Sequence, residues 1–447
     1  MLLRATPSGL LVDLYQFTMM QAYLEAGMTE TAVFEFFVRK LPKGRAFYVA
    51  GGLEQALDYL EDVAFEAPEL EWLASTGEFG RDFIDHLAAF RFTGDVHAMP
   101  EGTVFFPDEP ILRVTAPLPE AQFVESRLIN LLQFQTVIAA KAARMVLAAD
   151  GRTLVDFGFR RAHGEEAGLL AARAAYFTGF AGTATVGAAR LFGIPLYGTM
   201  AHSFIQAHDD EITAFRHFAE ARPSKLVLLI DTYDTVEGAR RVAELAKELR
   251  DQDIAVSGVR LDSGDLVELA GAVRAVLDEA GLQETRILAS GGIDETEIAR
   301  LLAAGAPLDG FGVGTSLTTS NDAPALDCAY KLQEYAGLAR RKRSAGKATW
   351  PGRKQVYRWL DDDGRMLRDL VTVEEDEQAA TALIEPVMTG GKRLEASPSL
   401  EDVRAYAARQ LATLPDGLRR LEGADAYPVE VGEPLRALAD EVDRRTG

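Results

Sequence analysis

Apolar and polar positions alternate along this chain in patterns that predict both helices and strands. Apolar residues at helical spacing predict helices at 13–26 and 52–61, and an apolar run between them predicts a strand at 32–38. Residues 120–149 contain few helix breakers and are rich in Leu, Ile, Phe and Ala, which predicts one long helix or two abutting helices. We expect this stretch to open the main domain.

The central third of the chain alternates between short apolar runs and helical patterns. The apolar runs lie at residues 226–230, 254–261, 286–289 and 310–313. The stretch between the first two runs carries a helical face of apolar residues at Val242, Leu245, Ala246 and Leu249. Strand and helix recur at roughly 30 residues, which is the length of a βαβ unit. The pattern therefore predicts a parallel sheet covered by helices.

Polar residues follow each of these four predicted strands directly. In chain order they are Asp231, Arg260 with Asp262, Ser290-Gly291-Gly292, and Gly314-Thr315. In a (β/α) barrel the carboxyl ends of the strands converge on the active site, and the last strands commonly carry a phosphate site. A doubly wound open sheet also places polar groups at strand ends. The order observed here favours the barrel over the open sheet.

The residues at these strand ends indicate phosphate and ribose chemistry. Glycines at 291, 292, 312 and 314 leave backbone N–H groups unobstructed for phosphate, although either glycine pair alone could simply make a tight turn. Asp231, Asp262 and Asp265 would repel phosphate, so they indicate ribose hydroxyls as donors or magnesium held through water. The alternative is that they cap helices, which suits Asp265 best.

One histidine stands out because it lies near a predicted helix start, in Gly198-Thr199-Met200-Ala201-His202-Ser203. A neutral imidazole keeps a nitrogen lone pair, so it can shuttle protons or attack phosphorus. A lone histidine is more often structural, and His163 beside Arg160 and Arg161 is an intermediate case. His202 is nevertheless a better functional candidate than His86, His97, His208 and His217.

Composition and charge narrow the classes of function. The chain has 447 residues, room for two or three domains, and a formal net charge of -21, which argues against nucleic acid or an anionic membrane surface as a partner. The single cysteine, Cys328, excludes an internal disulfide and a multi-cysteine zinc site. No stretch approaches the ~18 apolar residues of a membrane span, so we expect a cytoplasmic protein.

Two segments near the C-terminus carry no assigned chemistry. A basic run at 340–354 taken alone indicates nucleic acid, but in an acidic chain a solvated loop or an intersubunit contact is favoured. The sequence from 369 onward is acidic and contains a predicted helix at 399–414 with Ser399 as its cap.

Eight strings in order make the chain resemble the nicotinate phosphoribosyltransferases, a family related to nicotinamide phosphoribosyltransferase. They are VDLYQFTM, DFGFRRAHG, GTMAHS, LIDTYDT, RLDSGDL, SGGIDE, FGVGTSL with DAPALDCAYKL, and GKATWPGRKQVYR. The resemblance implies an incomplete, TIM-like (β/α) barrel and an additional α/β domain formed by N-terminal and C-terminal segments. The expected parts are 1–120, 121–330 and 331–447, the last with a helical tail. A homodimer with shared active sites is implied too.

The resemblance also implies a reaction and its residues. Nicotinate and phosphoribosyl pyrophosphate would form nicotinate mononucleotide and pyrophosphate, the first step of NAD salvage from nicotinate, with Mg²⁺ as cofactor and no direct protein ligand assigned to it. ATP would be a co-substrate that phosphorylates His202, and Asp231 and Asp262 would join His202 in catalysis. Nicotinate would be held by Tyr15 from the neighbouring subunit, Phe157, Thr199 and Arg260. The phosphoribosyl pyrophosphate would be held by Arg160, Asp262, Ser290, Gly291, Gly292, Gly314 and Thr315.

Three alternatives stay open at this stage. Relatives that use nicotinamide carry an aspartate where Ala184 stands, and its absence here favours nicotinate. A catalytically inactive, nucleotide-binding relative would lose the strand-end residues, yet Arg260, Asp262 and His202 are present. A barrel enzyme that forms a Schiff base needs a lysine at a strand end, and none follows these four strands.

Overall fold

The computed structural model describes residues 8–344 and 346–446, and the chain divides into two compact units. The first unit combines Met1–Ala140 with Ala323–Gly447, and the second is Lys141–Asp322. The domain boundaries predicted after residues 120 and 330 stay predictions.

The second unit is built on a curled sheet of six parallel strands. In spatial order they are β7 (Gly182–Thr183), β6 (Thr153–Asp156), β11 (Gly310–Val313), β10 (Arg286–Ala289), β9 (Val256–Leu261) and β8 (Leu226–Leu229). This order follows the chain around a ring that is interrupted between β7 and β8, whereas a doubly wound sheet reverses direction at a central strand. The sheet is a half-barrel, and the predicted parallel α/β architecture is confirmed.

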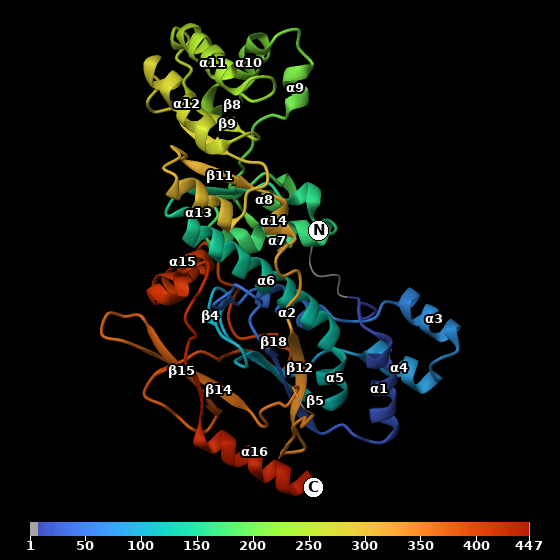
Figure 1. Ribbon diagram of the computed structural model, residues 1–447. Coiled ribbons are helices and arrows are strands. Elements are labelled where there is room, and N and C mark those ends of the chain that lie inside the picture. The colour runs from blue at the N-terminus through green and yellow to red at the C-terminus, as the bar shows by residue number, and fades with distance from the viewer. Residues whose placement is uncertain (1–7, 345, 447) are drawn as a thin grey trace. The chain divides into compact units, whose positions relative to one another are not determined.

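Helices cover this sheet. They are α7 (Glu165–Thr178), α8 (Val186–Phe192), α9 (His202–Gln206), α10 (Glu211–Ala221), α11 (Thr235–Arg250), α12 (Leu266–Glu279), α13 (Glu295–Ala303) and α14 (Thr315–Thr318), with 3-10 turns η1 (Phe159–Arg161) and η2 (Pro223–Lys225). Helices α10 to α12 lie beside β8 and β9 (Figure 1). The predicted apolar face of α11 is buried, and Asp265 caps α12 by accepting from the N–H groups of Val267 and Glu268.

The first unit draws its strands from both ends of the chain. Its largest sheet is antiparallel and contains β13 (Leu338–Ala339), β12 (Cys328–Tyr335), β1 (Thr31–Val38), β5 (Pro110–Pro117), β3 (Asp95–Ala98), β17 (Glu385–Thr389) and β18 (Lys392–Arg393). A second sheet contains β16 (Thr381–Ala382), β14 (Lys354–Leu360), β15 (Met366–Val373) and β19 (Val429–Val431), and a two-stranded sheet pairs β2 (Tyr48–Val49) with β4 (Val104–Phe105).

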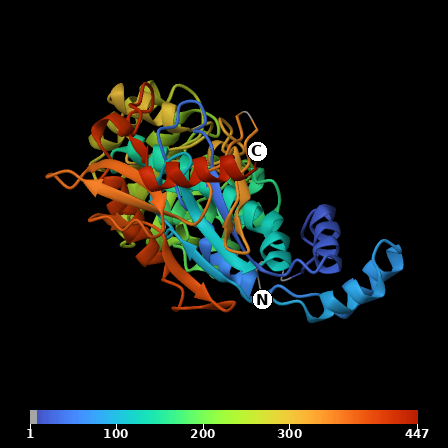
Figure 2. The same cartoon turned by 90° about the horizontal axis from the view of Figure 1, so that it is seen from below.

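Three helices predicted from apolar spacing, at 13–26, 52–61 and 399–414, are present in the first unit. The helices of this unit are α1 (Leu14–Glu25), α2 (Leu53–Asp62), α3 (Ala67–Thr76), α4 (Arg81–Ala89), α5 (Leu118–Phe123), α15 (Leu400–Ala412), 3-10 turn η3 (Asp416–Arg419) and α16 (Glu433–Thr446). In Figure 2 the light-blue pair α3 and α4 lies to one side of the strands of this unit. Ser399 caps α15 by accepting from the Asp402 N–H, as predicted.

The long apolar stretch forms two abutting helices, α5 and then α6 (Glu125–Ala149). The expectation that nothing here is as long and apolar as a membrane span is wrong for α6. Among the residues that the structure describes, α6 alone passes that test of length and composition. However, 67% of its most apolar window is buried inside the protein, as in the core helix of a globular fold. The burial explains why this helix is so apolar.

An ionic cluster lies in the core of the first unit. Arg358 of β14 donates from Nε to Asp369 Oδ1 at 2.9 Å and from Nη2 to Asp369 Oδ2 at 2.5 Å, and both side chains are almost fully buried. The Tyr427 hydroxyl donates to Asp369 Oδ1 at 2.9 Å. Burial and the neighbouring Asp369 carboxylate raise the pKa of Glu109 well above its ordinary value, although Arg358 opposes them. The surroundings of Glu109 in this cluster therefore favour the protonated form of its carboxyl group.

Candidate functional site

Strands of the second unit end at one edge of the sheet, and the polar residues singled out from the sequence lie there. Arg260 of β9 is in register with Leu229 of β8 and Leu288 of β10, so these carboxyl ends are level. We call this edge the rim, defined by the residues at or just after the strand ends: Phe157, Asp231, Arg260, Asp262, Ser290 and Gly314. In half-barrel and barrel sheets this edge is the functional one.

Arg260 is the centre of hydrogen bonding at the rim. Its Nη1 donates to Asp262 Oδ1 and to Ser290 Oγ, each at 3.0 Å. Its Nε donates to Thr199 Oγ1 at 3.3 Å, and Nη2 donates to the Met200 carbonyl at 2.8 Å. Arg260 and Asp262 therefore form an ion pair. These bonds use four of the five N–H groups of a guanidinium, so one Nη2 N–H has no partner among the described residues.

Charges and an aromatic ring surround this guanidinium. Burial lowers the pKa of Arg260, attraction to Asp262 and Asp231 opposes that effect, and repulsion from Arg160 adds to it. The group stays charged, because the ordinary pKa of arginine is far above neutral pH. Its Cζ lies 6.0 Å from the centre of the Phe157 ring, at the outer range of a cation–π contact. Phe157 and Arg160 thus share the surroundings of Arg260.

The two rim aspartates have different partners. Asp262 directs Oδ1 to Arg260, whereas its Oδ2 lies 3.8 Å from His202 Nε2. Asp231 accepts through Oδ2 from the backbone N–H of Asp262 at 2.9 Å and from the Ser263 hydroxyl at 2.6 Å. Its Oδ1 is buried and has no hydrogen-bond partner in the described part of the chain. Both aspartates therefore have an oxygen left for a ligand.

His202 is the first residue of α9, as the sequence predicted. Its Nδ1 lies within hydrogen-bond distance of Thr232 Oγ1, at 3.1 Å. The 3.8 Å separation between Nε2 and Asp262 Oδ2 is too long for a hydrogen bond. The side chain is 39% exposed. The imidazole is therefore fixed at the rim and still open to a ligand.

The glycines at or near two strand ends differ in why the structure has glycine at each position. At Gly291, φ is +86°, and a Cβ would lie 2.0 Å from the Asp262 carbonyl oxygen, so the tight turn itself requires glycine. Gly292 also has a positive φ, of +71°, but the space beside it is open. At Gly312 a Cβ would lie 2.4 Å from the Phe157 ring, so this glycine makes room for the ring.

Gly314 and Thr315 lie where β11 leads into α14. Gly314 occupies the cap position of that helix without a side-chain cap, and Thr315 is exposed. The backbone N–H of Phe157 donates to the Val313 carbonyl at 2.7 Å, which ties this turn to the end of β6. The predicted phosphoribosyl-binding residues therefore lie on neighbouring strand ends, while their roles stay predictions.

Two residues that shape the rim were not predicted from the sequence. Thr232, which contacts His202, directly follows Asp231, and its place after a strand was the available signal. Asp156 ends β6 and is buried, and it accepts from the Thr183 hydroxyl at 2.6 Å and from the Gly158 N–H at 2.8 Å. Burial raises the pKa of Asp156, although both bonds oppose the rise. Asp156 thus fixes the turn that carries Phe157.

Tyr15 belongs to the first unit, unlike the other predicted site residues. It lies on α1, its side chain is 44% exposed, and its hydroxyl donates to Glu125 Oε2 at 3.3 Å. Glu125 also accepts from Gln16 and Gln122 and pairs with Lys331. The Tyr15 ring is therefore held by its hydroxyl while a large part of it faces solvent.

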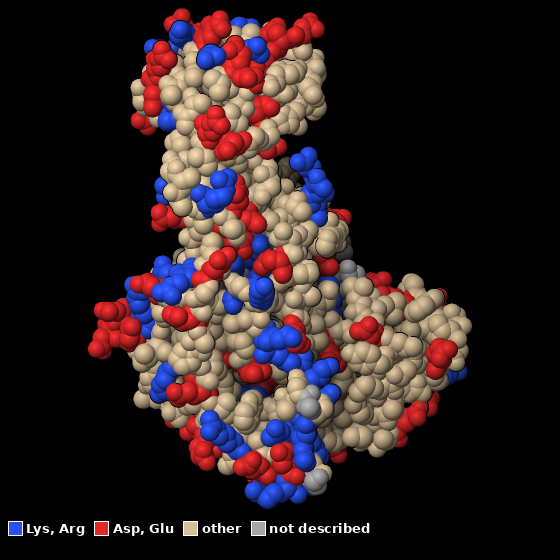
Figure 3. Space-filling model, in the orientation of Figure 1, with Lys and Arg blue, Asp and Glu red and all other residues tan. Residues whose placement is uncertain are grey.

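The basic run at 340–354 is largely neutralised inside the first unit. Arg341 and Arg343 both approach Asp443 of α16, at 3.7 and 3.6 Å, and Lys354 pairs with buried Glu35 at 2.7 Å. On the face seen in Figure 3, Lys and Arg are interspersed with Asp and Glu, including over α16 at the lower end of the view. This arrangement does not resemble a nucleic-acid footprint, which needs clustered positive charge.

Comparison with known proteins agrees with the geometry of the rim. Family models match three parts of the chain: the nicotinate phosphoribosyltransferase N-terminal domain at residues 10–133, the nicotinate phosphoribosyltransferase family at 152–338, and the nicotinate phosphoribosyltransferase C-terminal domain at 376–439. The second of these matches contains every predicted site residue except Tyr15, which lies in the first.

Similar proteins match over nearly the whole chain. A nicotinate phosphoribosyltransferase of Mycobacterium tuberculosis is 49% identical over 97% of this chain and 94% of its own length, and that of Bacillus subtilis is 37% identical over 94% and 92%. The crystal structure of human nicotinic acid phosphoribosyltransferase is 30% identical, with a TM-score of 0.87 over 97% of this chain and all of that one. The chain therefore belongs to the nicotinate phosphoribosyltransferase family.

Proposed function

We propose that this chain joins nicotinate to the ribose of phosphoribosyl pyrophosphate, giving nicotinate mononucleotide and pyrophosphate, as the first step of NAD salvage from nicotinate. The observation that carries the proposal is the rim itself, where Arg260, Asp262 and His202 come together in a chain of this family. We further propose that the half-barrel is an incomplete TIM-like barrel, because its strands keep ring order.

Arg260 is the group proposed to bind the nicotinate carboxylate. It has one Nη2 N–H without a partner, and Thr199 Oγ1 lies beside its Nε. A planar, charged guanidinium binds a carboxylate better than a lysine does. Ala184 lies at the same edge of the sheet, after β7, and leaves no carboxylate there to repel the substrate. Phe157, with Tyr15 of the partner subunit in a homodimer, would sandwich the pyridine ring.

The proposed chemistry needs no strong base. Loss of pyrophosphate leaves positive charge at the anomeric carbon, and the pyridine nitrogen of nicotinate attacks with its own lone pair. Asp262, helped by the Ser290 turn, would hold the ribose hydroxyls, and Arg160 with the Gly292 and Gly314–Thr315 turns would hold the phosphates. Asp231 and Asp262 each keep a carboxylate oxygen that suits hydrated Mg²⁺, which when bound neutralises the leaving pyrophosphate.

ATP is proposed to be coupled through His202. One imidazole nitrogen attacks the γ-phosphorus of ATP, ADP leaves, and hydrolysis of the resulting phosphohistidine releases phosphate. The added phosphoryl group changes the charge at the rim by roughly two units, which alters the affinity for pyrophosphate-bearing ligands. The exposure of the ring and its contact with Thr232 support this role.

We also propose a cytoplasmic location. Cys328 is free, and burial raises the pKa of its thiol to about 11. Such a thiol is unreactive and needs no oxidising compartment.

The reaction is tested by incubating purified protein with phosphoribosyl pyrophosphate, Mg²⁺ and either nicotinate or nicotinamide, with and without ATP. Mass spectrometry identifies the nucleotide. We expect nicotinate mononucleotide, formed faster with ATP. Product from nicotinamide alone would assign the other base, and no nucleotide from either base would refute the proposal.

The coupling is tested with His202→Asn, and His217→Asn, an exposed histidine on α10, is the matched control. We expect His202→Asn to stop nicotinate-dependent ADP formation and to keep some uncoupled transfer, while the control behaves as wild type. Full ATP stimulation in His202→Asn would contradict the coupling.

A further inference from the structure

A polar pocket lies in the second unit, at the opposite edge of its sheet from the rim. Its lining comes from the segments that directly precede β6, β10 and β11, together with Arg274 of α12. The rim lies at the carboxyl ends of these same strands, so the two sites are separated by the length of the sheet. The proposed transfer reaction makes no use of this pocket.

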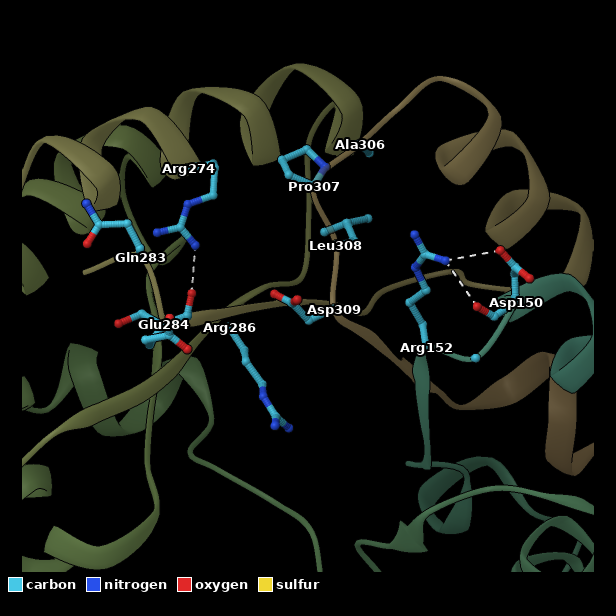
Figure 4. Close-up of a pocket in the computed structure, with 12 residues that line it drawn as sticks. Asp150, Arg152, Arg274, Gln283, Glu284, Arg286, Ala306, Pro307, Leu308 and Asp309 are labelled. Carbon is cyan, nitrogen blue, oxygen red and sulfur yellow. Dashed lines mark hydrogen bonds and ion pairs between the residues drawn. The ribbon is translucent and has the colours of Figure 1, made fainter. Parts of the chain in front are cut away.

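The pocket is large enough for a small molecule. Its volume is about 650 Å³, which is within the range of small-ligand sites. Figure 4 shows polar side chains around it, with only Ala306, Pro307 and Leu308 as an apolar part of the lining. A ligand here would therefore be recognised mainly by charge and hydrogen bonds.

Three arginines line the pocket, and they differ in how far their N–H groups are used. Arg274 has a contact at each of its three nitrogens, since Nη1 and Nη2 donate to the carbonyls of Thr285 and Leu282 and Nε lies 2.8 Å from Asp278 Oδ1. Arg152 uses only Nη1, which donates to the Asp150 carbonyl at 3.0 Å and to its carboxylate at 3.2 Å.

Arg286 is the arginine without a partner. It is the first residue of β10, it is exposed, and its guanidinium has neither hydrogen bond nor ion pair to any residue that the structure describes. In Figure 4 its side chain extends from the strand with no interaction drawn to it. Arg286 and the unused groups of Arg152 are thus the donors open to an anion.

The pocket also carries acceptors, which argues against a bare anion as its ligand. Glu284 is exposed and has no partner among the described residues, and Asp309 uses Oδ2 to accept from the Ile287 N–H at 2.8 Å. These carboxylates would repel a second negative group but would accept hydrogen bonds from hydroxyls. In a chain with a net charge of -21, an anion needs the local arginines, and its neighbouring hydroxyls need the carboxylates.

We propose that this pocket is a second binding site for a phosphorylated sugar, with the phosphate on Arg286 and Arg152 and the sugar hydroxyls on Glu284 and Asp309. The inference does not depend on the transfer reaction, because it uses different residues at the other edge of the sheet. It assigns to the amino ends of the strands a binding role beside the catalytic role proposed for their carboxyl ends.

The test is hydrogen–deuterium exchange of the full chain with ribose 5-phosphate, orthophosphate or ribose as probe. Ribose 5-phosphate is expected to slow exchange in peptides covering 150–153, 283–287 and 306–309, orthophosphate to do so at higher concentration, and ribose not to do so. Arg286→Gln should weaken this protection by roughly 10- to 100-fold in apparent affinity, because a charge-assisted hydrogen bond is lost.

Arg190→Gln is the matched control, since Arg190 is also exposed and unpaired in the described structure but does not line the pocket. If Arg286→Gln unfolds at lower temperature than the control, Arg152→Gln takes its place and is expected to weaken the same protection. Protection confined to the rim peptides, or equal protection in the pocket variants and the control, would overturn the proposal.

Discussion

Two arginine–aspartate pairs in this chain lie in different surroundings and differ in how many hydrogen bonds join them. At the rim, the side chains of Arg260 and Asp262 are 12% and 35% exposed, and Asp262 keeps one oxygen free of hydrogen bonds. In the core of the first unit, those of Arg358 and Asp369 are 3% and 0% exposed, and both Asp369 oxygens are occupied. The first pair therefore keeps a carboxylate oxygen for a ligand, whereas both carboxylate oxygens of the second pair are used in hydrogen bonds within the fold.

The difference follows from desolvation. The charges of a buried ion pair lose their hydration free energy on leaving water, and hydrogen bonds between the partners must replace it. Breaking such a pair therefore leaves an uncompensated charge. A partly exposed pair keeps some of its hydration, so its loss is felt mainly by the ligand that it binds. Substitutions in each pair test this difference.

The largest effect is expected from Arg358→Met. This change leaves Asp369 buried beside Glu109 without its cation, so the free energy of unfolding should fall by about 3–5 kcal/mol. Arg365→Met removes an exposed pair with Asp416 from the same unit and should leave the free energy of unfolding nearly unchanged. Chemical denaturation measures the free energy of unfolding of both variants. Equal losses of this free energy would contradict a difference between the buried and the exposed pair.

The next effect is expected from Arg260→Met, and it concerns activity. Losing the guanidinium should lower kcat/KM for nicotinate by about 100-fold or more, equivalent to about 3 kcal/mol, because a hydrogen-bonded charge contact to the substrate is lost. The free energy of unfolding should change much less than in Arg358→Met. Arg240→Met, on the exposed face of α11, is the control. If Arg260→Met keeps the wild-type kcat/KM for nicotinate, Arg260 is not part of the nicotinate site.

The buried cluster also predicts a dependence of stability on pH. Since the folded-state pKa of Glu109 is raised above the ordinary 4.5, the folded chain holds this proton more tightly than the unfolded chain. The stabilising contribution is fully present below the unfolded-state pKa, declines as the pH rises between the two pKa values, and is lost above the folded-state pKa. Glu109→Gln should flatten this decline when denaturation is followed from acid to alkaline pH. An unchanged slope would show that Glu109 is not the titrating group.

The smallest effect is expected from Thr232→Val. This nearly isosteric change removes one hydrogen bond to His202 Nδ1, worth about 1 kcal/mol, so ATP stimulation should fall by roughly 5-fold. Uncoupled transfer should stay close to wild type, because Thr232 contacts neither proposed substrate. Thr235→Val, at the start of α11, is a control for the substitution itself. Equal ATP stimulation in both variants would exclude a positioning role for Thr232.

The sequence predicted those parts of the molecule that depend on local periodicity. Strands β10 and β11 have the predicted bounds, and the residues following them lie at one edge because parallel strands place their ends together. The start of β9 differs, at Val256 rather than 254, since an apolar residue before a strand does not fix where pairing begins.

The partners of the charged residues could not be predicted in the same way. Arg260 contacts residues 30 and 61 positions away, and Glu109 and Asp369 meet from distant segments of the first unit. No apolar spacing encodes such pairings, which arise only when the chain packs. The resemblance to a family pointed to Arg260, but it gave no sign of the buried cluster, because that cluster supports the fold.

The most direct test makes the same substitution at the two aspartates and measures activity and stability for each variant. Asp262→Asn and Asp369→Asn are the same isosteric change, and each protein can be measured for both nicotinate kcat/KM and the free energy of unfolding. We expect Asp262→Asn to lose roughly 10-fold or more in kcat/KM and little stability, and Asp369→Asn to lose a few kcal/mol of stability, about 2 or more. If Asp262→Asn keeps full activity, or destabilises the chain as much as Asp369→Asn does, the rim is not the functional site described here.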